Sequence, residues 1–225
     1  MSSSLFRSKG RKVVAIGFNY ANHARELGNA LPVKPIVFLK PTSSYCPVGR
    51  AITIPEQYDV HHEVELGVVI GKPARRVSEA NAMGHVQGYA LAIDLTARDL
   101  QTKARAVGHP WTVAKGFDDF TPITDMVPAS AIRDPHDLRL WLKVNGKMRQ
   151  DGSTRDMIFR IPSLISYVSQ IMTLEEGDVI LTGTPSGVAS IKPGDRVECA
   201  VVEDGVGEVL HGEWDVRGGH HRSSV

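Results

Sequence analysis

The 225 residues of this chain are enough for one large domain with a full hydrophobic core, and we expect one domain rather than two small ones. Lysine and arginine total 26 and aspartate and glutamate total 25, so charge gives no reason to expect nucleic acid or an anionic membrane as a partner. A small-molecule ligand is favoured instead. The two cysteines, Cys46 and Cys199, have no metal-ligand spacing, which argues against a disulfide scaffold or a zinc site and is typical of a reducing compartment.

The ends of the chain differ in composition from the rest. Residues 1–12 are rich in serine, basic and free of acidic side chains, which resembles an organellar import sequence but is shorter than is typical. No apolar run is long enough to span a membrane, and no signal-peptide core precedes Val13. We expect a soluble mitochondrial or cytoplasmic protein that is not secreted, with a flexible basic start at 1–12, one catalytic domain at 13–216 and a disordered tail at 217–225.

Short apolar runs rich in β-branched residues and bounded by Gly, Pro or Asp predict strands. They lie at 13–16, 36–39, 64–70, 89–93, 138–144, 179–181 and 196–202. Helical spacing is confined to 78–83, 96–106 and 161–172. The strands do not alternate regularly with helices, and glycine-containing turns at 144–147 and 192–195 are typical of antiparallel hairpins, so the pattern predicts an α+β fold.

Glu63 and Glu65 are two residues apart in a predicted strand, so both carboxylates project from one face while apolar residues fill the other. Alone, a Glu-x-Glu pair on an exposed edge is more often solvated surface. A second predicted strand ends at Asp94, whose carboxylate would complete a set of three. Close carboxylates raise each other's proton affinity unless a cation neutralises them, and an all-oxygen set favours Mg²⁺ first and Mn²⁺ second, with Ca²⁺ a further alternative and zinc disfavoured.

His23 and Glu26 are three residues apart in a segment that follows the first predicted strand. On a helical turn this spacing places both side chains on one side, where the carboxylate can orient the imidazole to take a proton from water. A solvated surface pair is the alternative interpretation. Gly17 and Gly28 flank the pair, which suits a segment that closes over a ligand.

Two further segments carry polar groups beside apolar sequence. Lys115 lies between an apolar run and Gly116-Phe117, where it is either a surface lysine or a cation that stabilises a developing enolate. The run at 182–187 follows a predicted buried strand, and its backbone N–H groups and hydroxyls either hold a carboxylate or simply form a tight turn.

Six motifs occur in one order along most of the chain. They are Gly-x-Asn-Tyr-x-x-His-x-x-Glu at 17–26, Phe-Leu-Lys-Pro at 38–41, His-x-Glu-x-Glu-Leu at 61–66, Asp-Leu-Thr-Ala-Arg-Asp-Leu-Gln at 94–101, Ala-Lys-Gly-Phe-Asp at 114–118 and Thr-Gly-Thr-Pro-Ser-Gly-Val at 182–188. In this order and spacing they resemble the fumarylacetoacetate hydrolase family, in particular its short acylpyruvase and oxaloacetate decarboxylase or tautomerase branch. The resemblance extends from about residue 13 to residue 216.

The resemblance implies a mixed β-sheet roll with a few short helices, a homodimer, and Mg²⁺ held by Glu63, Glu65 and Asp94. It also implies a catalytic dyad of His23 and Glu26 on a segment that becomes ordered when ligand binds, with Lys115 beside the metal. The positions that match substrate-contacting residues of the family are Lys40, Arg98, Gln101 and Thr184.

A metal chelated by the carboxylate and 2-oxo oxygens of a 2-oxo acid would make the substrate an electron sink for cleavage of its C3–C4 bond. This chemistry serves hydrolysis of acylpyruvates, decarboxylation of oxaloacetate and enol–keto tautomerisation of oxaloacetate, and the sequence leaves all three open. One alternative is an isomerase or hydratase of 2-hydroxymuconate-type or 2-oxo-heptenedioate-type compounds. A second is a non-catalytic member that binds a metabolite or a protein partner, which has no need for a water-activating dyad.

Overall fold

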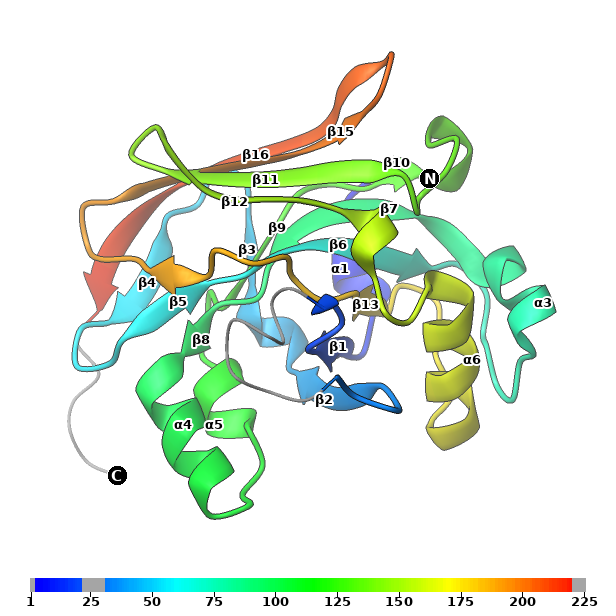
Figure 1. The fold of residues 1–225 in the computed structure, drawn as a ribbon, viewed down its shortest axis with the longest axis horizontal. Coiled ribbons are helices and arrows are strands. Elements are labelled where there is room, and N and C mark those ends of the chain that lie inside the picture. Colours follow the sequence, from blue (N-terminus) through cyan, green and yellow to red (C-terminus); the bar gives the residue numbers. More distant parts are fainter. Residues whose placement is uncertain (1–2, 22–30, 220–225) are drawn as a thin grey trace.

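The computed structural model describes residues 3–21 and 31–219. Figure 1 shows a five-stranded sheet packed over a larger, eight-stranded sheet, with the longer helices at the periphery. The strand order of the larger sheet is β2-β1-β13-β6-β7-β9-β3, and β10 pairs with β7. The order of the smaller sheet is β12-β11-β15-β16-β4, and a third sheet has the order β14-β5-β8.

The elements have the following bounds. The larger sheet comprises β2 (Ile36–Lys40), β1 (Val13–Gly17), β13 (Val179–Leu181), β6 (Val64–Ile70), β7 (Val86–Ile93), β9 (Thr121–Ile123), β3 (Tyr45–Pro47) and β10 (Val127–Pro128). The five-stranded sheet comprises β12 (Lys147–Ser153), β11 (Leu138–Val144), β15 (Arg196–Glu203), β16 (Gly207–Gly219) and β4 (Ile52–Pro55). The third sheet comprises β14 (Ala189–Ser190), β5 (Val60–His62) and β8 (Thr96–Ala97). The α-helices of the described residues are α1 (Phe6–Lys9), α3 (Glu79–Ala82), α4 (Arg98–Ala106), α5 (Thr112–Lys115) and α6 (Ile161–Ile171), and short 3₁₀ turns lie at Thr42–Ser44, Met83–His85, Ala129–Ala131 and Thr154–Asp156.

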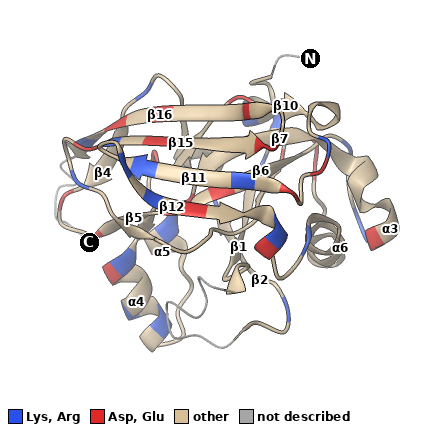
Figure 2. Cartoon of the chain, turned by 45° about the horizontal axis from the view of Figure 1, so that its top comes forward, with Lys and Arg blue, Asp and Glu red and all other residues tan. Residues whose placement is uncertain are grey.

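The sheets combine both strand directions, since β1 pairs with β13 in parallel while β1 and β2 are antiparallel. With few and short helices, this is the mixed α+β architecture that the sequence predicts. Figure 2 shows Lys and Arg interspersed with Asp and Glu over the strands of the smaller sheet and over α4. Residues of both charge signs are therefore mixed along these elements.

Strand β6 lies inside the larger sheet between β13 and β7, and all seven of its residues are buried. Leu66 and Val68 on one face pack in the main hydrophobic core, while Val69 on the other face packs in a second cluster. Full burial of one such aliphatic side chain contributes about 1.5–3 kcal/mol, so packing holds this strand in place. Polar groups attached to β6 are consequently carried on a rigid support.

The predicted helix at 96–106 begins two residues late. Thr96 and Ala97 form β8, in which Thr96 pairs with His61 and Ala97 pairs with Val60. The helix starts at Arg98, whose backbone N–H donates to the carbonyl oxygen of Asp59 at 2.8 Å. Pairing with a distant strand overrides local helical spacing here.

One of the two predicted hairpins is confirmed. Strands β11 and β12 are antiparallel and are joined through Asn145 and Gly146. The other prediction is wrong, because the turn at 192–195 leads from β14 in the third sheet to β15 in the five-stranded sheet. Strand β15 instead forms an antiparallel hairpin with β16, the next strand in the sequence, through a turn at residues 204–206.

Ordered structure extends beyond the expected domain limits at both ends. Within the segment expected to be flexible, α1 forms and Phe6 is buried, with its ring edge-on to Tyr45 at 6.3 Å. At the other end, β16 continues to Gly219 because its last residues pair with β4. Both cysteines are buried and free. None of the helices in the described part of the chain is long and apolar enough to cross a membrane.

Candidate metal centre and its pocket

The pairing of β6 with β7 brings the three predicted carboxylates together. Glu65 lies within β6, Glu63 immediately precedes this strand, and Asp94 immediately follows β7. The backbone N–H of Asp94 donates to the carbonyl oxygen of Glu63 at 2.8 Å. One oxygen from each carboxylate lies within 4.8 Å of the others, and the three residues are only 7%, 2% and 1% exposed. The alternative interpretation, in which Glu63 and Glu65 lie on a solvent-exposed strand edge, is therefore wrong.

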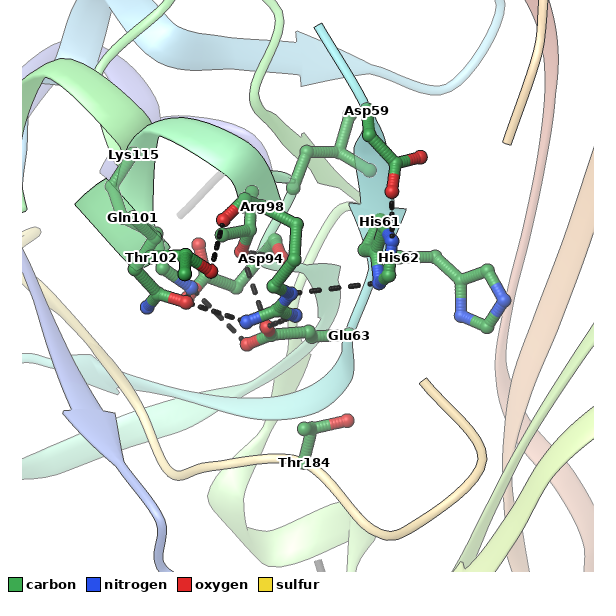
Figure 3. Close-up of polar contacts among 12 residues, drawn as sticks. Asp59, His61, His62, Glu63, Asp94, Arg98, Gln101, Thr102, Lys115 and Thr184 are labelled. Carbon is green, nitrogen blue, oxygen red and sulfur yellow. Dashed lines mark hydrogen bonds and ion pairs between the residues drawn. The ribbon is translucent and has the colours of Figure 1, made fainter. Parts of the chain in front are cut away.

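Two of these carboxylates, Glu63 and Asp94, are surrounded by cations from three elements, namely Lys40 of β2, Arg98 of α4 and Lys115 of α5. The ammonium of Lys115 donates to Asp94 at 2.5 Å and to Glu63 at 3.1 Å. Arg98 forms a short ion pair with the other oxygen of Glu63, and Figure 3 shows its guanidinium lying against this carboxylate. A buried carboxylate stays ionised only with such partners, since water no longer solvates its charge.

Glu65 differs from its neighbours because it forms no ion pair with any described residue. Its carboxylate accepts a hydrogen bond from the backbone N–H of Gly183 at 2.7 Å. Burial raises the pKa of Glu65 well above its usual range, and the charges of Asp94 and Glu63 raise it further. A cation among the three oxygens would stabilise the ionised form of Glu65 against burial and the neighbouring negative charges. An all-carboxylate donor set suits a hard divalent ion. The side chains present therefore fit a divalent metal site.

The two buried lysines respond differently to the same surroundings. Burial lowers the pKa of Lys115, but the carboxylates of Asp94 and Glu63 outweigh burial, so its pKa is raised overall. For Lys40, burial outweighs the attraction of Asp94, and the pKa is lowered. Both shifts follow from competition between desolvation and neighbouring charge.

Lys40 lies behind Asp94 rather than in the pocket wall. Its ammonium donates to Asp94 at 2.5 Å, to the carbonyl oxygen of Phe120 at 2.7 Å and to that of Leu95 at 3.3 Å. An ammonium has three N–H donors, and all three are used within the protein. The geometry thus gives Lys40 a role in holding Asp94, which differs from the substrate contact that the sequence predicts.

A pocket opens beside the carboxylates. Its wall is formed by Ile16, Gly17, Phe18, Phe38, Glu63, Glu65, Asp94, Arg98, Gln101, Trp111, Lys115 and Thr184. Three of the four predicted substrate-contacting residues belong to this wall. Arg98 and Gln101 lie one turn apart on α4, and a guanidinium N–H of Arg98 donates to the Gln101 side-chain oxygen at 2.6 Å.

An aromatic cluster forms the apolar part of the wall, which the sequence analysis missed. Trp111 meets Phe38 at 5.4 Å and Phe18 at 6.1 Å between ring centroids, both in edge-to-face arrangements. The ammonium of Lys115 lies 4.9 Å from the centroid of the Phe38 ring. These residues come from separate parts of the sequence, so no local spacing indicates that they meet.

Two histidines that received no predicted role lie beside the site. His61 contacts Asp59 at 2.8 Å and accepts a long hydrogen bond of 3.5 Å from the side chain of Arg98, as Figure 3 shows. His62 is fully buried and contacts the Gln150 side-chain oxygen at 2.8 Å. Burial lowers the pKa of His62 to about 4, so this imidazole is neutral at physiological pH.

The predicted dyad of His23 and Glu26 lies outside the described residues. The remaining predicted residues are all described. Glu63, Glu65, Asp94 and Lys115 converge on one point, Arg98, Gln101 and Thr184 line the adjoining pocket, and Lys40 supports Asp94 from behind.

Comparison with known proteins identifies the family of this chain. The model of the family described as fumarylacetoacetate (FAA) hydrolase C-terminal matches residues 12–211. The chain is 57% identical over 202 residues to "Oxaloacetate tautomerase FAHD1, mitochondrial" of Arabidopsis thaliana, covering 89% of this chain and 90% of the relative. It is 54% identical over 198 residues to "Oxaloacetate decarboxylase, mitochondrial" of Dictyostelium discoideum, covering 87% and 91%.

A solved structure shows the same fold. Fumarylpyruvate hydrolase from Pseudomonas aeruginosa, in complex with Mn²⁺ and pyruvate, superposes with a TM-score of 0.85 at 36% identity, covering 93% of this chain and 91% of that one. The family match spans most of the chain, and the relatives agree with it over nearly their whole length. The chain belongs to the fumarylacetoacetate hydrolase family.

Proposed function

We propose that this chain is a Mg²⁺-dependent enzyme that acts on oxaloacetate, by enol–keto tautomerisation and by decarboxylation, and that hydrolyses acylpyruvates. The observation that carries the proposal is a buried carboxylate triad beside a buried lysine, in a chain 57% identical to a protein named as an oxaloacetate tautomerase. A relative at 54% identity is named as an oxaloacetate decarboxylase. In both named reactions negative charge develops on the C2 and C3 atoms of oxaloacetate, as an enolate.

Glu63, Glu65 and Asp94 would hold the metal, with Mg²⁺ as first choice and Mn²⁺ as second. The Mn²⁺ and pyruvate in the structure of the Pseudomonas relative support a divalent ion and a 2-oxo acid in this kind of site. When bound, the ion supplies Lewis acidity to the carboxylate and 2-oxo oxygens of the substrate. The finding that Glu65 has no ion pair with a described residue supports its assignment as a ligand.

The cationic side chains of the pocket would stabilise negative charge on the substrate. Lys115 is held at its position by Asp94 and Glu63, and its raised pKa keeps the ammonium charged where an enolate oxygen develops. Arg98 presents a planar guanidinium that suits a substrate carboxylate, and Gln101 fixes the direction of one of its N–H groups. The sequence positions of Arg98, Gln101 and Thr184 favour substrate contact, and all three line the pocket.

The dyad of His23 and Glu26 is proposed from the sequence alone. Its imidazole would accept a proton from water during acylpyruvate hydrolysis, with Glu26 orienting the ring. Decarboxylation of oxaloacetate needs no water, so His23→Ala should reduce acetylpyruvate hydrolysis more than oxaloacetate decarboxylation. Steady-state assays of both reactions on one preparation measure the difference, and equal losses in the two reactions would contradict the assignment.

Assembly and location extend the proposal. The family resemblance supports a homodimer, which light scattering coupled to size-exclusion chromatography measures directly. The two named relatives are both described as mitochondrial, which supports a mitochondrial rather than cytoplasmic location for this chain. Fractionation of cells that express the tagged full chain tests this, and recovery in the cytosolic fraction alone would contradict it.

A substrate panel tests the proposed function. Enol oxaloacetate, keto oxaloacetate, acetylpyruvate, fumarylpyruvate and a 2-hydroxymuconate are each incubated with enzyme and Mg²⁺, and the products are identified by NMR. We expect enol–keto conversion and loss of CO₂ from oxaloacetate, together with cleavage of acetylpyruvate. Turnover of the hydroxymuconate alone would favour the isomerase alternative, and binding without turnover of any acid would favour a metabolite-binding protein.

A further inference from the structure

Gln150 is the one buried residue of β12, an edge strand of the five-stranded sheet. The strand pairs with β11, but the register shifts so that Leu142 faces Gln150 while Lys143 faces Met148. Arg149 is therefore an extra residue in a β-bulge, a feature that redirects neighbouring side chains. The bulge lies beside Gln150, whose side chain is directed away from solvent and is completely buried.

Four hydrogen bonds occupy the Gln150 amide fully. Its oxygen accepts from the backbone N–H of Val64 at 3.0 Å and lies 2.8 Å from Nδ1 of His62. Its nitrogen donates to the Thr184 hydroxyl at 2.7 Å and to the carbonyl oxygen of Pro185 at 2.9 Å. Val64 N–H can only donate and the Pro185 carbonyl can only accept, so the backbone fixes which end of the amide is which. His62 must therefore carry its proton on Nδ1.

These bonds join two segments that carry the metal centre. Val64 stands between Glu63 and Glu65, and its carbonyl oxygen accepts a hydrogen bond from the Thr184 hydroxyl at 2.8 Å. The preceding residue of the same loop, Gly183, donates its backbone N–H to Glu65. Thr184 thus accepts from Gln150 and donates to the ligand strand, which closes a ring of contacts.

Close packing of the same strand against the same loop supports this reading. Gly152 of β12 faces Pro185 so closely that a Cβ atom at Gly152 would lie 2.5 Å from the Pro185 Cβ. Non-bonded carbon atoms cannot approach to that distance, so a side chain at Gly152 would displace the loop. Strand β12 therefore holds the loop by both hydrogen bonding and shape.

We propose that Gln150 is a positioning residue of the metal centre, which locks the strand carrying Glu63 and Glu65 to the loop carrying Gly183 and Thr184. Gln150 contacts none of the three carboxylates and does not itself line the pocket, and it acts through Val64 and through Thr184, a residue of the pocket wall. The inference rests on the divalent-cation site proposed above. Groups that orient the ligands of a metal typically contribute about 10- to 100-fold to metal affinity.

The first test replaces the amide with an apolar group of similar shape. Mn²⁺ binding to the purified full chain is measured by EPR of free Mn²⁺ for the parent, for Gln150→Met and for Thr154→Val. Thr154 is equally buried near the end of the same hairpin, and its hydroxyl bonds the backbone of Leu138. We expect Thr154→Val to lower the melting temperature and to leave the Kd for Mn²⁺ unchanged. We expect Gln150→Met to raise the Kd for Mn²⁺ about 10- to 100-fold.

A second test reaches the loop by another route and keeps all polar groups. Gly152→Ala pushes on Pro185, whereas Gly84→Ala places its methyl group in open space and serves as the control. We expect Gly152→Ala to bind Mn²⁺ more weakly than the parent, and Gly84→Ala to bind it as tightly as the parent. The inference is overturned if Gln150→Met binds Mn²⁺ as tightly as Thr154→Val. A parent protein that binds no Mn²⁺ would instead overturn the cation site, and with it the proposed function.

Discussion

Two groups of ion pairs in this molecule have similar distances and very different surroundings. At the candidate metal centre the ammonium of Lys115 lies 2.5 Å from Asp94, and both side chains are almost completely buried. On the five-stranded sheet the guanidinium of Arg139 lies 2.6 Å from Asp151, with side chains 51% and 43% exposed. The two pairs do not differ in distance, so their burial decides how much each contributes to the stability of the fold.

Solvent explains the difference. In an exposed ion pair, water hydrates both charged groups and weakens the attraction between them. Such a pair typically contributes about 0 to 1 kcal/mol to stability. A buried charge has lost its hydration and depends on its partners, so removal of one partner costs about 3–5 kcal/mol. The charges of the candidate metal centre are therefore interdependent, whereas those of the surface are nearly independent. Variants in the two regions should differ accordingly.

The largest effect is expected for Asp94→Asn. Asparagine keeps the shape of the side chain but leaves Lys40 and Lys115 buried without this counterion. The free energy of unfolding should fall by about 3 kcal/mol, and both Mn²⁺ binding and oxaloacetate turnover should disappear. Urea denaturation and EPR measure the two effects. An unchanged urea midpoint together with full turnover would contradict the interdependence of these charges.

Metal removal comes next, since it leaves every side chain in place. After thorough treatment with EDTA and gel filtration, oxaloacetate and acetylpyruvate turnover should fall to the uncatalysed rate and return when Mg²⁺ is added. Mg²⁺ at about 100 times its Kd should also stabilise the fold by about 2.7 kcal/mol, seen as a higher melting temperature. Undiminished turnover by the chelated protein would refute metal dependence.

Lys115→Met tests one cation of the centre. The loss of a charge that stabilises the developing enolate should lower kcat for oxaloacetate decarboxylation about 10²- to 10³-fold. Lys40→Met is the matched comparison, because Lys40 is equally buried beside Asp94 but does not line the pocket. We expect Lys40→Met to reduce stability and to lower kcat much less. Equal losses of kcat would assign both lysines the same role.

The smallest effect belongs to the exposed pair. Arg139→Ala should lower the free energy of unfolding by about 0.5 kcal/mol at neutral pH and leave turnover unchanged. The hydrogen bond from Arg139 lowers the pKa of Asp151, so its stabilisation is present above the ordinary aspartate pKa and is lost as pH falls through the lowered value. Urea denaturation of both proteins at neutral pH and near pH 3 measures this, and a difference that grows on acidification would be the wrong sign.

Some features of the fold escaped the sequence analysis although a signal was present. In β16 the buried residues Leu210, Gly212, Trp214 and Val216 alternate with less buried ones, which is the period of a half-buried strand. Polar residues and glycines in this stretch conceal the alternation. For β12 no such signal exists, because Gln150 is polar and is the only residue of the strand that is buried.

The sequence by itself determined which carboxylates belong to the candidate metal centre and how Glu63 and Glu65 are spaced. The apolar residues around Glu63 and Glu65 predict a buried strand, and the period of a strand places both carboxylates on one face, because these properties depend only on neighbouring residues. Tertiary structure decided everything that joins distant segments. The pairing of β6 with β7 set Asp94 beside Glu63, a bulge directed Gln150 onto the Thr184 loop, and burial turned Lys40 into a support for Asp94. Desolvation and long-range pairing produce these outcomes, and neither can be calculated from a local window of residues.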